Sequence, residues 1–352
     1  MKIWNYIARF FCWYCIIVAF GLISLFSFLA LLEALDDVGK GDFTTFHAIQ
    51  IVLLTSGMRL IELLPVIVVL SSLLTIGGLA NNRELLIIRA VGVSKRQLVY
   101  VLSSLGLMMS LLSFLLLETL IPSLEKTAHE LSALTLEKTT IGANELWTRQ
   151  GLETMRIGNL DSHHIPRQLE IYETDLSGSL IRFIEAEKAY FQEDRNWILF
   201  NVSETIFSDT EITESKFDSL SWNSFLSKEQ FERLVAPPTT LSTLDLIKHL
   251  NQNKILAVDS SNYSSILWKK ISLPLTLIAM ATLSIPLLTF STKPRSSGYH
   301  AVIGGAIGIF FYLIEQTTSN LDQLLGLPPA LTSLAPPIII ITITLLLTRR
   351  AI

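Results

Sequence analysis

Six long apolar runs, separated by polar segments, dominate the hydrophobic pattern of the chain. Each is long enough to cross a hydrocarbon core roughly 30 Å thick. We therefore expect six transmembrane helices. The first run is too long for the core of a signal peptide, and no A-x-A-like cleavage site follows it, so it is expected to stay as a helix. The six runs are Phe10–Leu35, Leu60–Leu79, Leu98–Ile121, Ile266–Phe290, Ala301–Thr318 and Leu331–Leu347.

The pattern changes between the third and fourth runs. Short alternating segments rich in β-branched and aromatic residues, such as "QLEIYET" and "NWILFNVSETIF", are separated by turn signals such as "DLSG". Evenly spaced short strands of this kind predict an antiparallel sandwich or jelly roll. We expect helices 1–3 in residues 1–122, with a short helix in residues 81–92 between helices 2 and 3, an antiparallel β-jelly-roll domain in residues 123–240, and a connecting helix with helices 4–6 in residues 241–352.

Basic residues in the short loops predict the orientation, because cytoplasmic loops carry an excess of Lys and Arg. Ten of them flank one end of the expected helices, whereas the opposite short loops hold Lys40 and Arg59. Both termini are then cytoplasmic and the β domain is external. Residues 123–265 hold 22 acidic and 13 basic residues, within a net charge of −4 for the chain. An acidic domain lacks the basic footprint of a nucleic-acid-binding protein. The ten basic residues are Lys2, Arg9, Arg83, Arg89, Lys95, Arg96, Lys293, Arg295, Arg349 and Arg350.

A compact charged segment, "NNRELLIIRAVGVSKRQL", joins the second and third runs on the predicted cytoplasmic side. Asn81 and Glu84 resemble a capping box at the start of a short helix, and Gly92 is suited to ending it. Ser94 and Gln97 repeat the capping pattern at the start of the third run.

The short helix between these signals carries four consecutive aliphatic residues, Leu85 to Ile88. One interpretation is an interfacial helix resting on lipid with snorkelling arginines. The other is a projection held by a cytoplasmic partner. Four consecutive aliphatic side chains cannot all face lipid, which favours a partner groove.

The pattern R-E-L-x-x-x-R-A-x-G, from Arg83 to Gly92, resembles the coupling helix of ABC-type permeases that dock onto a separate ATPase. FtsX/MacB-type permeases carry it in a layout of four spans with the external domain after the first. Lipopolysaccharide export permeases of the LptF/LptG family have six spans with a β-jelly-roll domain after the third. The chain is similar to the second family over its full length, and Gly326–Pro329 resembles a G-[IL]-P-P element of its LptG members.

This resemblance implies partners and a site. An LptB-like ATPase dimer would grip the coupling helix, and an LptF-like subunit would pair with the chain in the bacterial inner membrane. LptC-like and LptA-like β proteins would receive lipopolysaccharide from the periplasmic domain. The expected ATPase-coupling residues are Arg83, Glu84, Leu85, Arg89 and Gly92.

No Walker A pattern occurs in the chain, so ATP hydrolysis is expected on another protein and the chain itself is not expected to be an enzyme. No cofactor is expected. His163 and His164 are adjacent, but no third ligand has a fixed spacing from them, so no metal site is expected either. Two alternatives stay open, an FtsX/MacB-like permease for lipoprotein release or mechanotransmission, and a membrane scaffold without transport.

Ionisable residues at the outer ends of the spans are candidates for contact with lipid, because charges at such depth usually face a cavity or a partner. The family often has lysines near the outer end of span 1, where this chain has Asp36 and Asp37 and only Lys40. Acidic side chains could instead meet lipid headgroups through divalent cations, or lie in ordinary interfacial positions, and Arg59 and Glu62 could form an i,i+3 pair. The expected lipid cavity or gate residues are Glu33, Lys40, Arg59, Glu62, Phe310, Phe311 and Glu315, and Glu118 is a further acid at an outer end.

The fifth run places Phe310 and Phe311 after three glycines, Gly304, Gly305 and Gly308. Small residues let membrane helices approach closely. This face is either a separable seam against span 1 of a partner permease, as a lateral gate needs, or a permanent packing face.

Overall fold

The computed structural model describes residues 2–135, 146–161, 165–192, 195–208, 211–235, 237–256, 261–289 and 297–350. The chain divides into two compact units. The helical unit comprises Met1–Glu33, Val52–Glu125 and Ser261–Ile352, and the sheet unit comprises Ala34–Ile51 and Lys126–Ser260.

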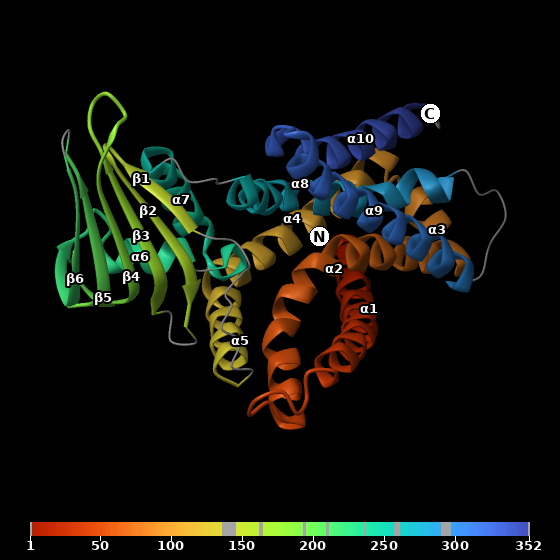
Figure 1. Ribbon diagram of the computed structural model, residues 1–352. Helices are drawn as coiled ribbons and strands as arrows, with labels where there is room; N and C mark the ends of the chain where they lie inside the picture. Colours follow the sequence, from red (N-terminus) through yellow and green to blue (C-terminus); the bar gives the residue numbers. More distant parts are fainter. Residues whose placement is uncertain are drawn as a thin grey trace. The chain divides into compact units, whose positions relative to one another are not determined.

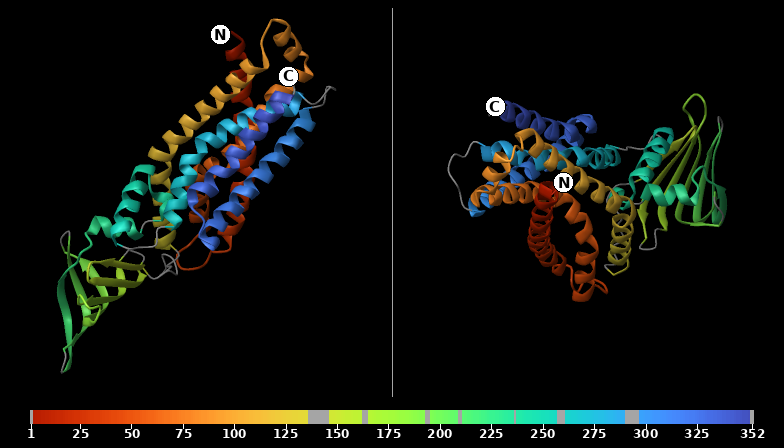
Figure 2. Two further views of the ribbon diagram at one scale, coloured as in Figure 1. Left: turned by 90° about the horizontal axis from the view of Figure 1, so that it is seen from above. Right: turned by 180° about the vertical axis from the view of Figure 1, so that it is seen from behind.

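Six helices are long and apolar enough to cross a membrane, as predicted. A seven-residue helix, α3 (Glu84–Ala90), follows the second of them. Within the helical unit, both ends of the chain and α3 lie at the same end of the helices (Figure 2). The six long helices are α1 (Lys2–Leu35), α2 (Thr45–Asn81), α4 (Lys95–Thr119), α8 (Ser261–Thr289), α9 (Ser297–Leu325) and α10 (Pro329–Arg350).

Helix α8 is central to this unit, since it packs against both α4 and α10, and α10 packs against α9. The approach of α4 to α8 depends on Gly106. A Cβ atom added there would lie 2.9 Å from the Cα of Ile278 and 3.0 Å from the carbonyl oxygen of Leu277. Both atoms are backbone, so neither can move aside without displacing the helix. Close approach through a small residue is the expected means of helix association in lipid.

Replacing Gly106 by alanine is therefore expected to lower the stability of the helical unit by about 1–3 kcal/mol, the usual cost of overpacking. Gly305→Ala is the matched control, because a Cβ atom there meets nothing within 4 Å. Thermal unfolding of the purified full-length chain in detergent measures the difference. Equal midpoints for the two variants would show that the α4–α8 crossing is looser than the structure indicates.

The glycines of α9 also differ in whether they contact another helix or face open space. A Cβ atom at Gly308 would lie 2.6 Å from Cγ1 of Val66, and one at Gly304 would lie 2.9 Å from a methyl carbon of Leu70. Both contacts are with α2 of the same chain. Gly304 and Gly308 thus belong to a packing face within the chain, and of the three glycines only Gly305 faces open space.

The sheet unit contains six antiparallel strands that follow one another in sequence order across a single sheet (Figure 1). The part of the predicted jelly roll that the structure describes is thus an antiparallel meander. The strands are β1 (Leu146–Gln150), β2 (Glu153–Leu160), β3 (Pro166–Thr174), β4 (Leu180–Phe191), β5 (Asn196–Phe207) and β6 (Ile212–Asn223). The helices are α5 (Ile121–Thr135, which begins in the helical unit), α6 (Lys228–Val235), the 3-10 turn η1 (Pro238–Thr240) and α7 (Thr243–Leu256).

One face of the sheet carries the core of this unit. Alternate residues of the strands point into it, as the period of two in a strand requires. Trp197 of β5 is fully buried and contacts the rings of Phe191, Trp222 and Phe231. Phe231 belongs to α6, so this helix closes the apolar face. The six-helix protein with an antiparallel β domain, expected from the sequence, is confirmed.

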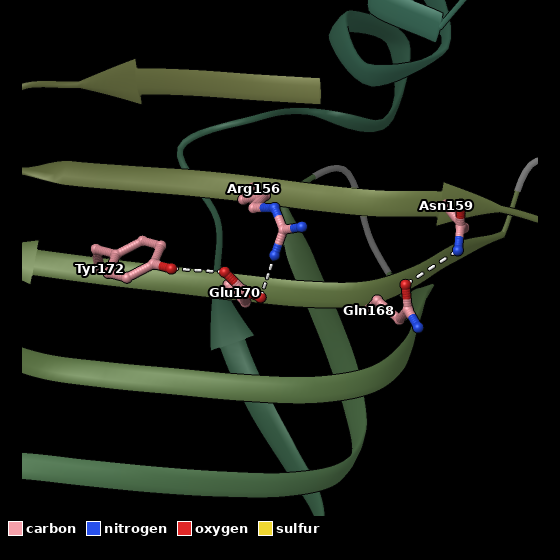
Figure 3. A network of polar contacts seen from close by, with 5 residues as sticks. All are labelled: Arg156, Asn159, Gln168, Glu170 and Tyr172. Carbon is pink, nitrogen blue, oxygen red and sulfur yellow. Dashed lines mark hydrogen bonds and ion pairs between the residues drawn. The ribbon is translucent and has the colours of Figure 1, made fainter. Parts of the chain in front are cut away.

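The opposite face is polar along β2 and β3, where Glu170 lies between Arg156 and Tyr172 (Figure 3). Glu170 forms an ion pair with Arg156 and accepts a hydrogen bond of 2.5 Å from the Tyr172 hydroxyl. Partial burial and this bond to a carboxylate raise the pKa of Tyr172 to about 12. Asn159 donates to Gln168 at 3.0 Å on the same pair of strands. The Arg156–Glu170 and Asn159–Gln168 contacts join β2 to β3, whereas the Tyr172–Glu170 bond lies within β3.

Candidate functional site

The short helix expected between the second and third spans is present as α3, but it begins differently from the prediction. Asn81 is the last residue of α2, so the predicted Asn81–Glu84 capping box is wrong. The N-cap residue is Arg83, whose backbone is left-handed with φ 60° and whose side chain makes no capping bond. The tight turn from α2 into α3 explains the difference, because Asn81 is still helical and unavailable as a cap.

The other two signals are confirmed. The end of α3 is a Schellman motif, in which the Val93 N–H donates to Ile88 O at 3.3 Å and the Gly92 N–H donates to Arg89 O at 2.9 Å. Gly92 has φ 97°, which a glycine adopts without strain. Ser94 and Gln97 form the capping box that starts α4.

The aliphatic residues of α3 do not all face the same way. Ile88 is buried in the core of the helical unit and Leu85 packs against that core. Leu86 and Ile87 are 65% and 63% exposed, and Val91 just beyond the helix is 72% exposed. Three large apolar side chains therefore form an outward-facing surface, which we call the α3 apolar surface. Arg83 and Arg89 are exposed beside it.

Glu84 lies at the start of α3 and is half-buried. Its Oε2 accepts a hydrogen bond of 2.8 Å from the hydroxyl of Tyr6 in α1, and its Oε1 accepts one of 3.4 Å from the amide of Asn82. Both donors are neutral, so the carboxylate is oriented without being neutralised. An oriented carboxylate that has no ion pair among the described residues, and that lies beside an apolar surface, is suited to a charged partner group.

A second group of predicted residues meets at one place on the helical unit. Glu62 of α2 lies within electrostatic range of Arg59 and of Lys269 in α8, and Glu315 of α9 lies within range of Glu62 and Lys269. The Arg59 guanidinium donates to the carbonyl oxygen of Val52 at 3.2 Å. We call the side chains of Arg59, Glu62, Lys269 and Glu315 the charged cluster.

No three His, Cys, Asp or Glu side chains in the described residues are placed to hold a metal ion. The cation-bridged contact between these acids and lipid headgroups stays a prediction. His163 and His164 lie outside the described residues.

The remaining predicted lipid residues are elsewhere. Glu33 is exposed near the end of α1. Lys40 belongs to the sheet unit and forms an ion pair of 2.5 Å with Asp37. The positive charge of Lys40 is therefore paired with one of the acids that stand where family lysines were expected. Phe310 is 66% exposed whereas Phe311 is buried in the core of the helical unit, because neighbours on a helix point to different faces.

Glu125, in the part of α5 that belongs to the helical unit, adds a buried acid near this cluster. It is 6% exposed, and its Oε1 has no hydrogen-bond partner. Burial and then the nearby Glu62 raise the pKa of Glu125 to about 7, partly offset by Arg59. Near neutral pH this carboxyl therefore exists in both forms.

This raised pKa predicts a pH-dependent stability. A folded-state pKa above the ordinary value of 4.5 means that the folded chain holds a proton that the unfolded chain releases. Stability is then highest below the ordinary pKa and falls as the pH rises through about 7. Between pH 5 and pH 8 we expect the free energy of unfolding to fall by about 1–2 kcal/mol. A loss of that size lowers the midpoint of thermal unfolding by several degrees.

Glu125→Gln should reduce that drop, because the amide stays neutral throughout the range. Glu130→Gln is the control, since this carboxylate is exposed on the same helix. Thermal unfolding of the full chain across the pH range makes the measurement. A drop of equal size in Glu125→Gln and in the unaltered chain would exclude Glu125 as its source.

Three residues of these sites were not singled out from the sequence. Lys269 had a usable signal, because a basic residue inside the fourth predicted span is itself unusual. Tyr6 and Glu125 had no such signal in the sequence, because neither lies in a motif. The role of each depends on contacts with other helices. The pairing of Tyr6 with Glu84 spans 78 positions of sequence.

Comparison with known proteins shows the family of the chain. The family model for the lipopolysaccharide export system permease LptF/LptG matches residues 5–350. The lipopolysaccharide export system permease protein LptG of Haemophilus influenzae is 24% identical over 333 residues, which cover 94% of this chain and 93% of the relative. The protein of the same name from Escherichia coli K12 is 24% identical over 335 residues, with the same coverage. The chain belongs to the LptF/LptG family of lipopolysaccharide export system permeases and is a multi-pass protein of the inner membrane.

Proposed function

We propose that the chain is the LptG-like half of an ABC transporter that extracts lipopolysaccharide from the inner membrane and passes it towards the outer membrane. An LptF-like subunit completes the membrane part, and a separate LptB-like ATPase dimer supplies the energy. The α3 helix is the coupling helix to which this ATPase binds. The observation that carries the proposal is the α3 apolar surface with the oriented Glu84 carboxylate beside it.

The order of the elements supports this function over the FtsX/MacB alternative. The six strands lie between the third and fourth long helices, α4 and α8. An external domain after the first span, as in FtsX/MacB-type permeases, is not the observed layout. Both ends of the chain lie at the α3 end of the helical unit, which fits cytoplasmic termini and a cytoplasmic coupling helix (Figure 2). The sheet unit is then periplasmic.

The transport cycle follows from these placements. Movement of the ATPase dimer displaces α3, which is joined to α2 and α4 by two short turns. This displacement moves the charged cluster and the outer ends of α1 and α9 relative to the lipid headgroup. Arg59 and Lys269 then contact the headgroup phosphates, and Glu62 and Glu315 contact them through bridging cations. Strands β1 and β6 are the outermost strands of the described sheet, and LptC-like and LptA-like β proteins add their strands at these edges.

Copurification tests the coupling role. The full chain with its partner subunit should bring down the ATPase, and a Leu86→Ser, Ile87→Ser double variant should lower the recovered ATPase at least about tenfold. Burying each aliphatic side chain contributes about 1.5–3 kcal/mol, so two losses are enough for this effect. The matched control is Leu176→Ser, since Leu176 is 95% exposed in the turn between β3 and β4.

Normal recovery of the ATPase with the double variant, together with crosslinks from α3 to phospholipid alone, would show an interfacial helix instead. Failure of the unaltered chain to bring down any ATPase would favour the membrane scaffold. Identifying the lipid that accompanies the complex tests the substrate in the same preparation.

A further inference from the structure

The attachment of Glu84 to α1 is a feature that the proposed function does not explain. Its carboxylate is bonded to a residue of the first helix, and Tyr6 and Glu84 come from elements that are not sequence neighbours. A bond from a coupling helix to α2 or α4 would only reinforce elements already joined to it. The bond to α1 adds a connection between α3 and a separate membrane helix.

The first turns of α1 are firmly held, which fixes the position of the Tyr6 hydroxyl. Ile7 and Phe11 are buried in the core of the helical unit, at 1% and 0% exposure. Trp4 donates from its indole N–H to the Ser104 hydroxyl of α4 at 3.1 Å. The Tyr6 ring packs edge-on against Phe10 at 5.0 Å between centroids. The phenol is therefore presented to Glu84 by a supported ring.

Helix α3 needs such a support. A helix of seven residues is marginal in isolation. Its N-cap residue, Arg83, makes no side-chain capping bond and has a left-handed backbone. The bond from Tyr6 therefore stabilises the end of α3 that has no cap, whereas the Schellman motif and the buried Ile88 hold the other end.

The far part of α1 packs against the core of the helical unit along one face, which includes Val18, Leu22 and Phe26, and its other face is exposed. Phe20, Leu25, Phe28 and Leu32 are 74%, 54%, 57% and 49% exposed. Because α1 is one continuous helix from Lys2 to Leu35, a displacement of its first turns reaches its far part. The Tyr6–Glu84 bond is a direct side-chain hydrogen bond between α3 and the first turns of α1.

We propose that Tyr6 is a positioning residue for Glu84, which orients the carboxylate for the ATPase and transmits displacement of α3 to α1. This inference rests on the proposed function, because it takes the ATPase as the partner of Glu84. The phenol donates one hydrogen bond and carries no charge, so it leaves the carboxylate able to bind a cationic group of the partner. The partner's cationic group binds Oε1, so the bond from Tyr6 to Oε2 persists and α1 moves together with α3.

The test uses the complex of the full chain with its partner subunit and the ATPase. Tyr6→Phe removes the hydroxyl and keeps the ring. Tyr100→Phe is the matched control, because Tyr100 is 75% exposed on α4. We expect Tyr6→Phe to lower the kcat of ATP hydrolysis and the rate of lipid export on the order of 3- to 10-fold, the effect of one net hydrogen bond, with little change in KM. Tyr100→Phe should match the unaltered complex.

A double-mutant cycle separates positioning from a merely structural role. If Tyr6 acts through Glu84, Tyr6→Phe lowers turnover in the unaltered chain but adds nothing in a Glu84→Ala background at saturating ATPase, where no side-chain acceptor remains for the hydroxyl. Additive losses of turnover, or normal turnover in Tyr6→Phe, overturn the inference. The proposed function stands in either case if the unaltered chain still brings down the ATPase. Absence of the ATPase from the unaltered complex overturns both.

Hydrogen exchange gives a readout without the ATPase. In the purified chain, the α3 amides of Tyr6→Phe should exchange several-fold faster than those of Tyr100→Phe, since the uncapped end of α3 loses its support. Equal exchange in the two variants contradicts the positioning role.

Discussion

Replacing Glu84 by alanine is expected to abolish lipopolysaccharide export while leaving the chain folded and inserted in the membrane. The side chain lies on α3 and its loss removes hydrogen bonds to neutral donors, so the effect on folding is small. On the partner, the loss leaves a cationic group facing an apolar surface without its counter-charge. Such a charge-assisted contact contributes about 1.5–3 kcal/mol, or roughly a 10- to 150-fold change in affinity for the ATPase.

The affinity is measured by titrating the ATPase onto the permease pair, and export by following transfer of lipopolysaccharide from vesicles. Glu130→Ala is the control, because its carboxylate is exposed on α5 and forms an ion pair with Lys126 at 3.9 Å. Normal export by Glu84→Ala would contradict the coupling role of α3. Lost export with normal ATPase affinity would place the effect of Glu84 after docking.

Replacing Trp197 by alanine should have the largest effect on stability in the chain. The side chain is fully buried, its ring centroid is 4.5 Å from that of Phe191, and its indole N–H donates to Leu226 O at 3.2 Å. Truncating such a residue leaves a cavity and an unpaired carbonyl group, at a cost of about 3–5 kcal/mol. Amides of β4 and β5 should then exchange hydrogen about 10²- to 10³-fold faster in the full-length chain.

Trp147→Ala is the matched control for this experiment. Trp147 is 45% exposed on β1, and its ring stacks on Tyr172 at 6.1 Å on the polar face of the sheet. We expect its loss to change exchange in β4 and β5 by less than about tenfold, in keeping with an exposed position. If both variants accelerate exchange equally, the α6-covered face is not the main source of stability in this unit.

Local patterns determined which elements form. The six spans follow from runs of apolar residues, and the strands follow from alternation, because burial on one side of a strand requires it. The end of α3 at Gly92 and the start of α4 at Ser94 also depend only on near neighbours. The capping box proposed at Asn81 failed for the opposite reason. Whether Asn81 is a cap depends on where α2 ends, and packing along α2 decides that.

The sequence by itself determined the six spans, the intervening antiparallel strands, the charged segment after the second span and the resemblance to a permease family. Only the tertiary structure decided which side chains meet. It decided that Phe311 is buried and Phe310 exposed, directed Gly304 and Gly308 towards α2, and brought Lys269 to Glu62 and Tyr6 to Glu84. The physical reason is that helix and strand periodicity is set by neighbours a few residues apart, whereas these contacts depend on how helices distant in sequence cross and rotate against one another.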